Sequence, residues 1–165
     1  MKSLKKISIL FALAFISSNV ANAQTTRKDK KAAHITEIKN MVEAQNYVFN
    51  ANYAIPSRGA SMPLTSNYDL VVSKDTIIAF LPYFGRAYAA PYNPTEGGIK
   101  FTSTNFEYKV KPKKKGGWDV SINPKDTKDV RQLYLNISSS GNTTLQITSN
   151  NRQTISYYGY LTKAN

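Results

Sequence analysis

Residues that could do chemistry are concentrated in one stretch of the chain, from Leu81 to Phe101. The candidate ligand-binding residues there are one arginine and four aromatic side chains: Tyr83, Phe84, Arg86, Tyr88 and Tyr92. An arginine among rings either stacks on them and pairs with a carboxylate for structural reasons, or binds an anionic ligand. Both alternatives stay open at the level of sequence. The eleven tyrosines of the chain also indicate an aromatic surface that could accept sugar rings, peptide or lipid head groups.

Nucleophilic catalysis is not predicted, because the required residue types are missing. The chain has no cysteine, and its single histidine, His34, lies beside a polar segment near the N-terminus, where a surface position is expected. We therefore assign no catalytic residue. A carboxylate pair that cleaves a glycan remains an alternative, since five acidic residues lie in or beside predicted strands. These residues are Asp69, Asp75, Glu96, Glu107 and Asp119.

Metal and cofactor sites are also not expected. Asp126 and Asp129 are close in sequence but lack the further oxygen ligands of a calcium loop. No glycine-rich motif that would cradle a phosphate is present. We expect Gly97 and Gly98 to permit a tight turn before a strand rather than the close approach of a ligand.

The N-terminus has the pattern of a secretory signal peptide over residues 1–23. Three lysines precede the apolar run from Ile7 to Ile16, and Ala21 to Ala23 forms a small-residue cleavage site. The apolar run is about half of the roughly 20 residues that a membrane span needs. The mature chain should start at Gln24, and without cysteine it has no thiol for a lipid anchor. The predicted location is periplasmic or extracellular, without a transmembrane segment after cleavage.

The mature chain is strongly basic. Without the three signal-peptide lysines, 19 basic residues face ten acidic ones, a formal charge of +9. For an exported protein this favours anionic envelope components or glycans as partners, and nucleic acid is not expected. Solubility alone explains the charge equally well.

One helix and a series of strands follow the signal. Residues 24–30 are polar and predict a flexible tail, with Asp29 as a possible cap for a helix from Lys31 to Gln45. Within that helix the apolar residues recur at three- and four-residue spacing, at Ile35, Ile38, Met41 and Val42.

After Asn46 the apolar period changes to two, which predicts strands. The strands are expected at 47–56, 68–72, 76–81, 99–102, 106–111, 118–122, 133–137, 145–147 and 155–161. We expect a mobile loop at 57–63, a solvated lysine turn at 113–117, a helical turn around Asp126 and Asp129, and a turn at Asn150 and Asn151 that uses positive backbone angles. The predicted fold is mainly β: an antiparallel meander of eight or nine strands, closed as a small barrel or sandwich, with the N-terminal helix packed against it. Residues 31–165 should form this single domain.

The stretch from Leu81 to Phe101 resembles the signature of a family of small exported Bacteroidetes proteins, domain-of-unknown-function family 4251. The likeness extends to Phe106–Tyr108, Pro112–Trp118 and Thr148–Gln153. Other members of that family look like lipoproteins, and this chain departs from them in having no cysteine. The family carries no assigned activity. The function that we predict is therefore a non-enzymatic binding or structural module of the cell envelope, with the glycan enzyme and a carrier of a lipid or other hydrophobic ligand as alternatives.

Overall fold

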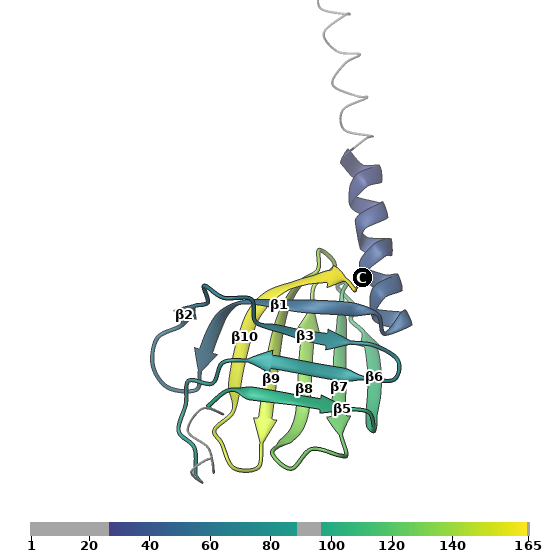
Figure 1. Cartoon of the computed structure of the whole chain (residues 1–165). Helices are drawn as coiled ribbons and strands as arrows, with labels where there is room; N and C mark the ends of the chain where they lie inside the picture. The colour runs from purple at the N-terminus through teal and green to yellow at the C-terminus, as the bar shows by residue number, and fades with distance from the viewer. Residues whose placement is uncertain (1–26, 89–96, 165) are drawn as a thin grey trace, which may run out of the picture. The chain divides into compact units, whose positions relative to one another are not determined.

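The computed structural model describes residues 27–88 and 97–164 (Figure 1). The chain divides into two compact units, residues 1–36 and 37–165. In the described part of the first unit, residues 27–36 are helical, and in the second unit residues 37–44 are helical. The predicted helix is thus present but includes residues 27–30, which we had expected to be part of the tail, and Asp29 lies within it rather than at its cap. Among the described residues, no helix combines the length and apolar character needed to cross a bilayer.

The described residues of the second unit also form ten antiparallel strands. They are β1 (Tyr47–Pro56), β2 (Met62–Pro63), β3 (Asp69–Val72), β4 (Ile77–Leu81), β5 (Ile99–Ser103), β6 (Phe106–Pro112), β7 (Trp118–Pro124), β8 (Val130–Ile137), β9 (Asn142–Ser149) and β10 (Ile155–Lys163). The predicted strands are all present, and the count rises to ten because the short β2 lies in the segment predicted as a loop. The mainly β, antiparallel prediction is confirmed.

The strands form one nearly closed, barrel-like sheet in the order β5-β4-β3-β1-β10-β9-β8-β7-β6, with β2 added to β1. In Figure 1, β1, β3, β4 and β5 lie in front and the strands from β10 to β6 cross behind them. The two ends of the sheet, β5 and β6, are consecutive in the chain. Asp126 holds their connection, because its carboxylate accepts hydrogen bonds from the backbone amides of Thr104 at 2.8 Å and Asn105 at 3.1 Å.

The strand β1 curves from one layer to the other at a bulge between Ala51 and Tyr53. The bulge reverses the alternation, so Tyr53 is exposed and Ala54 is buried. Opposite the bulge lies Gly159 on β10, where a Cβ would overlap the carbonyl oxygen of Asn50. The absence of a side chain at this position lets the two strands approach closely enough for the sheet to bend.

Large apolar side chains fill the interior of the barrel. Fully buried examples come from both layers: Tyr47, Phe49, Leu70, Ile77, Leu81, Ile122, Leu133, Leu135, Ile137, Leu145 and Tyr157. The helical turns at 37–44 close one end with Ile38, Met41 and Val42, all buried. The hydroxyl of Tyr108 donates to the carbonyl of Val42 at 2.9 Å and lies 3.2 Å from that of Tyr47. Buried side chains of the described strands therefore occupy the centre of the barrel.

Three local predictions differ from the structure. Residues 125–129 form bends instead of a helical turn. Asn150 and Asn151 do not have positive φ angles. Among the described residues, Gln45 is the one non-glycine residue that has a positive φ. The turn at Asn150 is held instead by its side-chain amide, which donates to the carbonyl of Lys128 at 3.0 Å. Of the three turn lysines, Lys113 does not point freely to water, since its ammonium donates to Asn136 at 3.0 Å.

Candidate functional site

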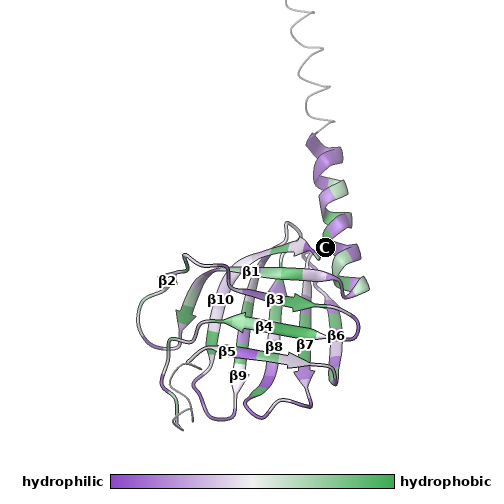
Figure 2. Cartoon of the chain, viewed as in Figure 1, coloured by the Kyte–Doolittle hydropathy of each residue, from purple (hydrophilic) through white to green (hydrophobic). Residues whose placement is uncertain are grey.

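The outer face of β4 carries apolar side chains where a solvated face would ordinarily be polar. The strand is hydrophobic along its whole length (Figure 2), and Ile78 and Phe80 are 43% and 41% exposed. Beside Phe80 lies a groove of about 400 Å³. Its described lining residues are Tyr68, Phe80, Leu81, Pro82, Tyr83, Phe84, Gly97, Gly98 and Lys100. We call this the aromatic groove.

Tyr68, Phe80 and Lys100 form a continuous row of side chains along the groove. Phe80 on β4 stands opposite Lys100 on β5, and the Lys100 ammonium lies 4.8 Å from the centre of the Phe80 ring. Tyr68, directly before β3, stacks on Phe80 with ring centres 5.6 Å apart and an interplanar angle of 22°. The antiparallel register sets this order, because Asp69 pairs with Phe80 and Phe80 pairs with Lys100.

Tyr83 is fixed in the wall of the groove by its hydroxyl group. The hydroxyl oxygen lies 2.9 Å from the carbonyl oxygen of Arg86 and 3.1 Å from that of Gln153, and these two acceptors share its single proton. It also fits closely over Gly85, where a Cβ would lie only 2.6 Å from the hydroxyl oxygen. Burial raises the pKa of Tyr83 above its usual value, so the hydroxyl stays protonated at neutral pH.

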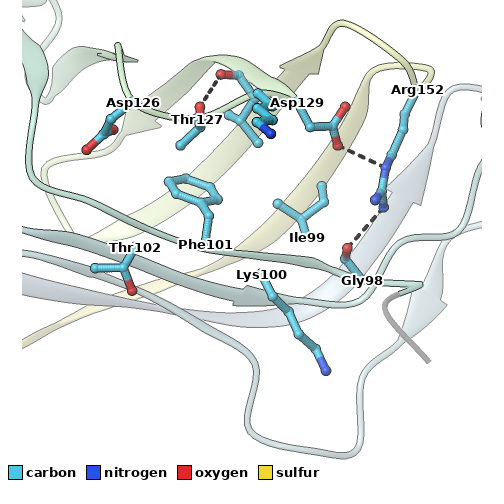
Figure 3. Close-up of a pocket in the computed structure, with 11 residues that line it drawn as sticks. Gly98, Ile99, Lys100, Phe101, Thr102, Asp126, Thr127, Asp129 and Arg152 are labelled. Atoms are coloured by element: carbon cyan, nitrogen blue, oxygen red, sulfur yellow. Dashed lines mark hydrogen bonds and ion pairs between the residues drawn. The ribbon is translucent and has the colours of Figure 1, made fainter. Parts of the chain in front are cut away.

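Arg152 connects Gly98, which lines the groove, with Asp129 in the loop between β7 and β8 (Figure 3). Its guanidinium pairs with Asp129 at 2.9 Å, donates to the Gly98 carbonyl at 3.0 Å, and lies 5.2 Å from the centre of the Tyr83 ring. Its side chain is only 17% exposed. Gly98 itself is held close to β4, since a Cβ there would come within 2.7 Å of the Leu81 carbonyl oxygen. The absence of a side chain at Gly98 thus permits the close approach of two backbones.

The structure separates the residues predicted for the site. Tyr83 and Phe84 line the groove, whereas Arg86 and Tyr88 are exposed and do not line it. Tyr92 lies outside the described residues. The backbone carbonyl of Arg86 accepts from the Tyr83 hydroxyl and from the Gln153 amide at 3.1 Å. Arg152 makes contacts of the kind considered for Arg86, because it lies over the Tyr83 ring and pairs with the carboxylate of Asp129.

Sequence reasoning missed three groove residues, Tyr68, Phe80 and Lys100. The sequence did contain a signal for Tyr68 and Phe80, which is the short turn at 73–75 between two predicted strands. The register of the resulting hairpin brings these two residues close together. The continuous apolar run of β4 was a second signal, because one face of a strand in this sheet faces solvent. Lys100 carried no signal of its own.

A second cavity of about 560 Å³ lies on the other side of β5, at the mouth of the barrel. Figure 3 shows Ile99 and Phe101 pointing toward the loop between β7 and β8. Both acidic residues of that loop are engaged in the fold. Asp129 pairs with Arg152, and Asp126 accepts from Ser103, Thr104 and Asn105, which lowers its pKa, with the Ser103 hydrogen bond as the largest cause.

Two of the acidic residues considered for glycan cleavage lie on strands that do not line the aromatic groove. Glu107 pairs with Lys125 at 3.4 Å on β6, and Asp119 lies 3.9 Å from Lys113 on β7. Asp69 on β3 pairs with Phe80 beside the groove but is not among its lining residues, and Asp75 lies in the turn that follows β3. Glu96 lies outside the described residues. Within residues 27–88 and 97–164, no group of three or more histidine, cysteine, aspartate or glutamate residues is placed to hold a metal ion.

Comparisons with known proteins identify a family without an assigned activity. No curated protein matches the chain. A crystal structure of a DUF4251 family protein from Bacteroides eggerthii DSM 20697 superimposes with a TM-score of 0.59 at 20% sequence identity, covering 81% of this chain and 91% of that one. This likeness shows a shared fold. The model of the family described as "Domain of unknown function (DUF4251)" matches residues 29–161, and the chain therefore belongs to the DUF4251 family.

Proposed function

We propose that the protein is an exported binding module that takes an acidic glycan of the cell envelope or the extracellular space in its aromatic groove. The observation that carries the proposal is the row Tyr68–Phe80–Lys100, in which exposed aromatic surface lies directly beside a cation. Sugar rings have apolar faces that pack on aromatic side chains, and a uronate carboxylate supplies the charge that complements a lysine. The groove offers both in one place.

The groove supports binding rather than cleavage. Hydrolysis of a glycosidic bond ordinarily needs two carboxyl groups that face the ligand. The described residues that line the groove include neither aspartate nor glutamate. A carrier of a hydrophobic ligand is also less well supported, because the barrel interior is occupied by side chains such as Phe49 and Tyr157.

Export is part of the proposal and rests on the signal pattern of residues 1–23. The native protein should begin at Gln24 and carry no acyl chains. Its intact mass, measured after purification from the native envelope fraction, checks both points. A mass that retains the apolar segment, or that includes added acyl groups, would contradict the proposed location.

The binding proposal is tested with the hyaluronan tetrasaccharide, a defined acidic oligosaccharide, titrated into ¹⁵N-labelled protein. We expect shifts in the amide signals of Phe80, Tyr83 and Lys100. Phe80→Ala should weaken binding by about tenfold, through loss of one stacking ring. Lys100→Gln should weaken binding as well and reduce its dependence on salt.

Ile78→Ala is the matched control for Phe80→Ala. Ile78 lies on the same strand and the same face with nearly the same exposure, 43%, but it does not line the groove. Its substitution should leave affinity unchanged. Equal affinities for Phe80→Ala and Ile78→Ala, or the absence of any shift at the groove, would rule out the proposed site.

A further inference from the structure

A second, polar hollow adjoins the aromatic groove. It has a volume of about 150 Å³, and its lining includes Asn50, Asn52, Asn67, Tyr68 and Tyr160. Tyr68 also lines the aromatic groove, so this one ring lies between the two depressions. We call the second depression the asparagine hollow.

The backbone around the hollow is held by pairing to β1. The Ala51 amide donates to the carbonyl of Tyr68 at 2.9 Å, and the Leu64 amide donates to the carbonyl of Asn52 at 2.8 Å. Both bonds fall beside the β1 bulge, on the side of β1 that pairs with β2 and β3. The hollow therefore has a defined wall instead of a loose loop.

The two depressions differ in chemistry. The aromatic groove has apolar walls and the ammonium of Lys100, whereas the described residues lining the asparagine hollow include amides and hydroxyls but no charged side chain. Each asparagine amide can donate two hydrogen bonds and accept through its oxygen. Asn50 already uses its amide nitrogen on the hydroxyl of Thr162 at 2.9 Å, while Asn52 and Asn67 are exposed. Neutral, hydroxyl-rich or amide-bearing groups suit this lining.

From this difference we infer the composition of the ligand: an oligosaccharide in which an acidic sugar is followed by a neutral one. The acidic unit lies against Phe80 beside Lys100, the chain crosses Tyr68, and the neutral unit binds in the asparagine hollow. This inference rests on the proposed function, because the acidic unit occupies the same groove. It adds that the ligand is at least two sugars long and that its charge is not repeated at every unit.

The test compares three probes by titration of the full mature chain. Methyl glucuronide supplies an acidic unit alone, the hyaluronan tetrasaccharide alternates uronate with an N-acetylated neutral sugar, and tetragalacturonate has the same length with a carboxylate on every unit. We expect the hyaluronan tetrasaccharide to bind at least about tenfold more tightly than either of the others, from two or more additional hydrogen bonds in the hollow.

The variant Asn67→Ala distinguishes the hollow from the groove. Asn67 is exposed, so its truncation should leave the fold intact. It should weaken binding of the hyaluronan tetrasaccharide by about fivefold and leave binding of methyl glucuronide unchanged. Phe80→Ala, in contrast, should weaken both probes.

The outcomes separate the two proposals. If methyl glucuronide binds at the groove but neither chain length nor alternation raises affinity, the inference about the hollow is wrong and the proposed function stands. Equal binding of tetragalacturonate and the hyaluronan tetrasaccharide also overturns the inference. If none of the three probes binds, the proposed function is overturned, and the inference with it.

Discussion

Arg152 contacts both described ends of the segment between β4 and β5. Its guanidinium contacts Asp129, the Gly98 carbonyl and the Tyr83 ring, and so connects the loop after β9 with the loop after β7 and with both ends of the segment between β4 and β5. A planar guanidinium with several donors can make such contacts in different directions at once. The backbones of the same loops also pair, through an antiparallel bridge between Ala87 and Arg152.

We predict that Arg152→Ala destabilises the protein by about 2 kcal/mol, because the ion pair is largely shielded and its loss leaves the carboxylate of Asp129 uncompensated. The Oδ1 atom of Asp129 is already buried without a hydrogen-bond partner in the part of the chain that the structure describes, which adds to the cost. Arg86→Ala, at an exposed residue, should change stability by less than about 0.5 kcal/mol. Urea unfolding of both variants checks the difference, and equal effects would contradict the assignment of Arg152.

The sequence could not distinguish these two arginines. Both lie in segments that resemble the family signature, and Arg86 has the aromatic neighbours in the chain. The partners of Arg152 come from the β7–β8 loop and the start of β5, which are brought to it only by the pairing of distant strands. Contacts of this kind follow from sheet order, and local residue patterns do not contain that order.

At the level of elements, the strands were predictable because their side chains alternate with a period of two between turn residues. The same rule fails where the alternation is interrupted. The bulge in β1 places Tyr53 outside although it is in phase with Tyr47 and Phe49, and the pairing of β2 with β1 depends on that curved segment. A bulge places one extra residue in one of two paired strands, and the types of residue in that strand do not show where it lies.

Gly159 provides the test of how the bend at β1 is made. We expect Gly159→Ala to destabilise the protein by about 3 kcal/mol or more, because the added methyl group would overlap the Asn50 carbonyl oxygen and force the two central strands apart. Ser156→Ala, on the same strand and partly exposed, should have little effect. Thermal unfolding followed by circular dichroism compares the two. A Gly159→Ala variant with the parent's melting temperature would show that the sheet does not need this close approach.

The candidate site was predictable only in part for a related reason. Tyr83 and Phe84 could be named from composition, since aromatic residues near glycines and prolines are unusual for a loop. The row Tyr68–Phe80–Lys100 needs the register of three segments and the choice of sheet face. The outer face of β4 is the one that carries Phe80, because the residues on either side of it, Ala79 and Leu81, are buried in the barrel interior.

On the scale of the whole molecule, the barrel is closed by side chains where backbone pairing stops. Among the described strands, β5 and β6 each pair with one neighbour only. Asp126 secures their connection at one end, and the tyrosine pair Tyr47 and Tyr108 joins β1, β6 and the end of the helix at the other. Because the interior is filled, both candidate ligand depressions, the aromatic groove and the asparagine hollow, lie on the outside of the sheet.

The pair of the buried Tyr47 and the half-buried Tyr108 predicts a loss of stability at alkaline pH. Burial raises the pKa of Tyr108 to about 12 and raises that of Tyr47 well above 10. A folded-state pKa above the unfolded value means that the contribution is complete below about pH 10 and is lost as the pH rises from 10 toward 12. The free energy of unfolding of the parent should therefore fall by about 2 kcal/mol or more over this range.

Tyr108→Phe is the variant that identifies the source of this loss. It keeps the ring but removes the hydrogen bond to the Val42 carbonyl, so at pH 8 it should be less stable than the parent by about 1 kcal/mol. Between pH 10 and 12 its stability should fall less steeply, because one buried hydroxyl no longer has to ionise in an apolar site. Urea unfolding at pH 8, 10 and 11.5 gives the three free energies for each protein. Parallel curves would mean that alkaline unfolding has another cause, and that the joint between β1, β6 and the helix does not depend on the protonated tyrosine pair.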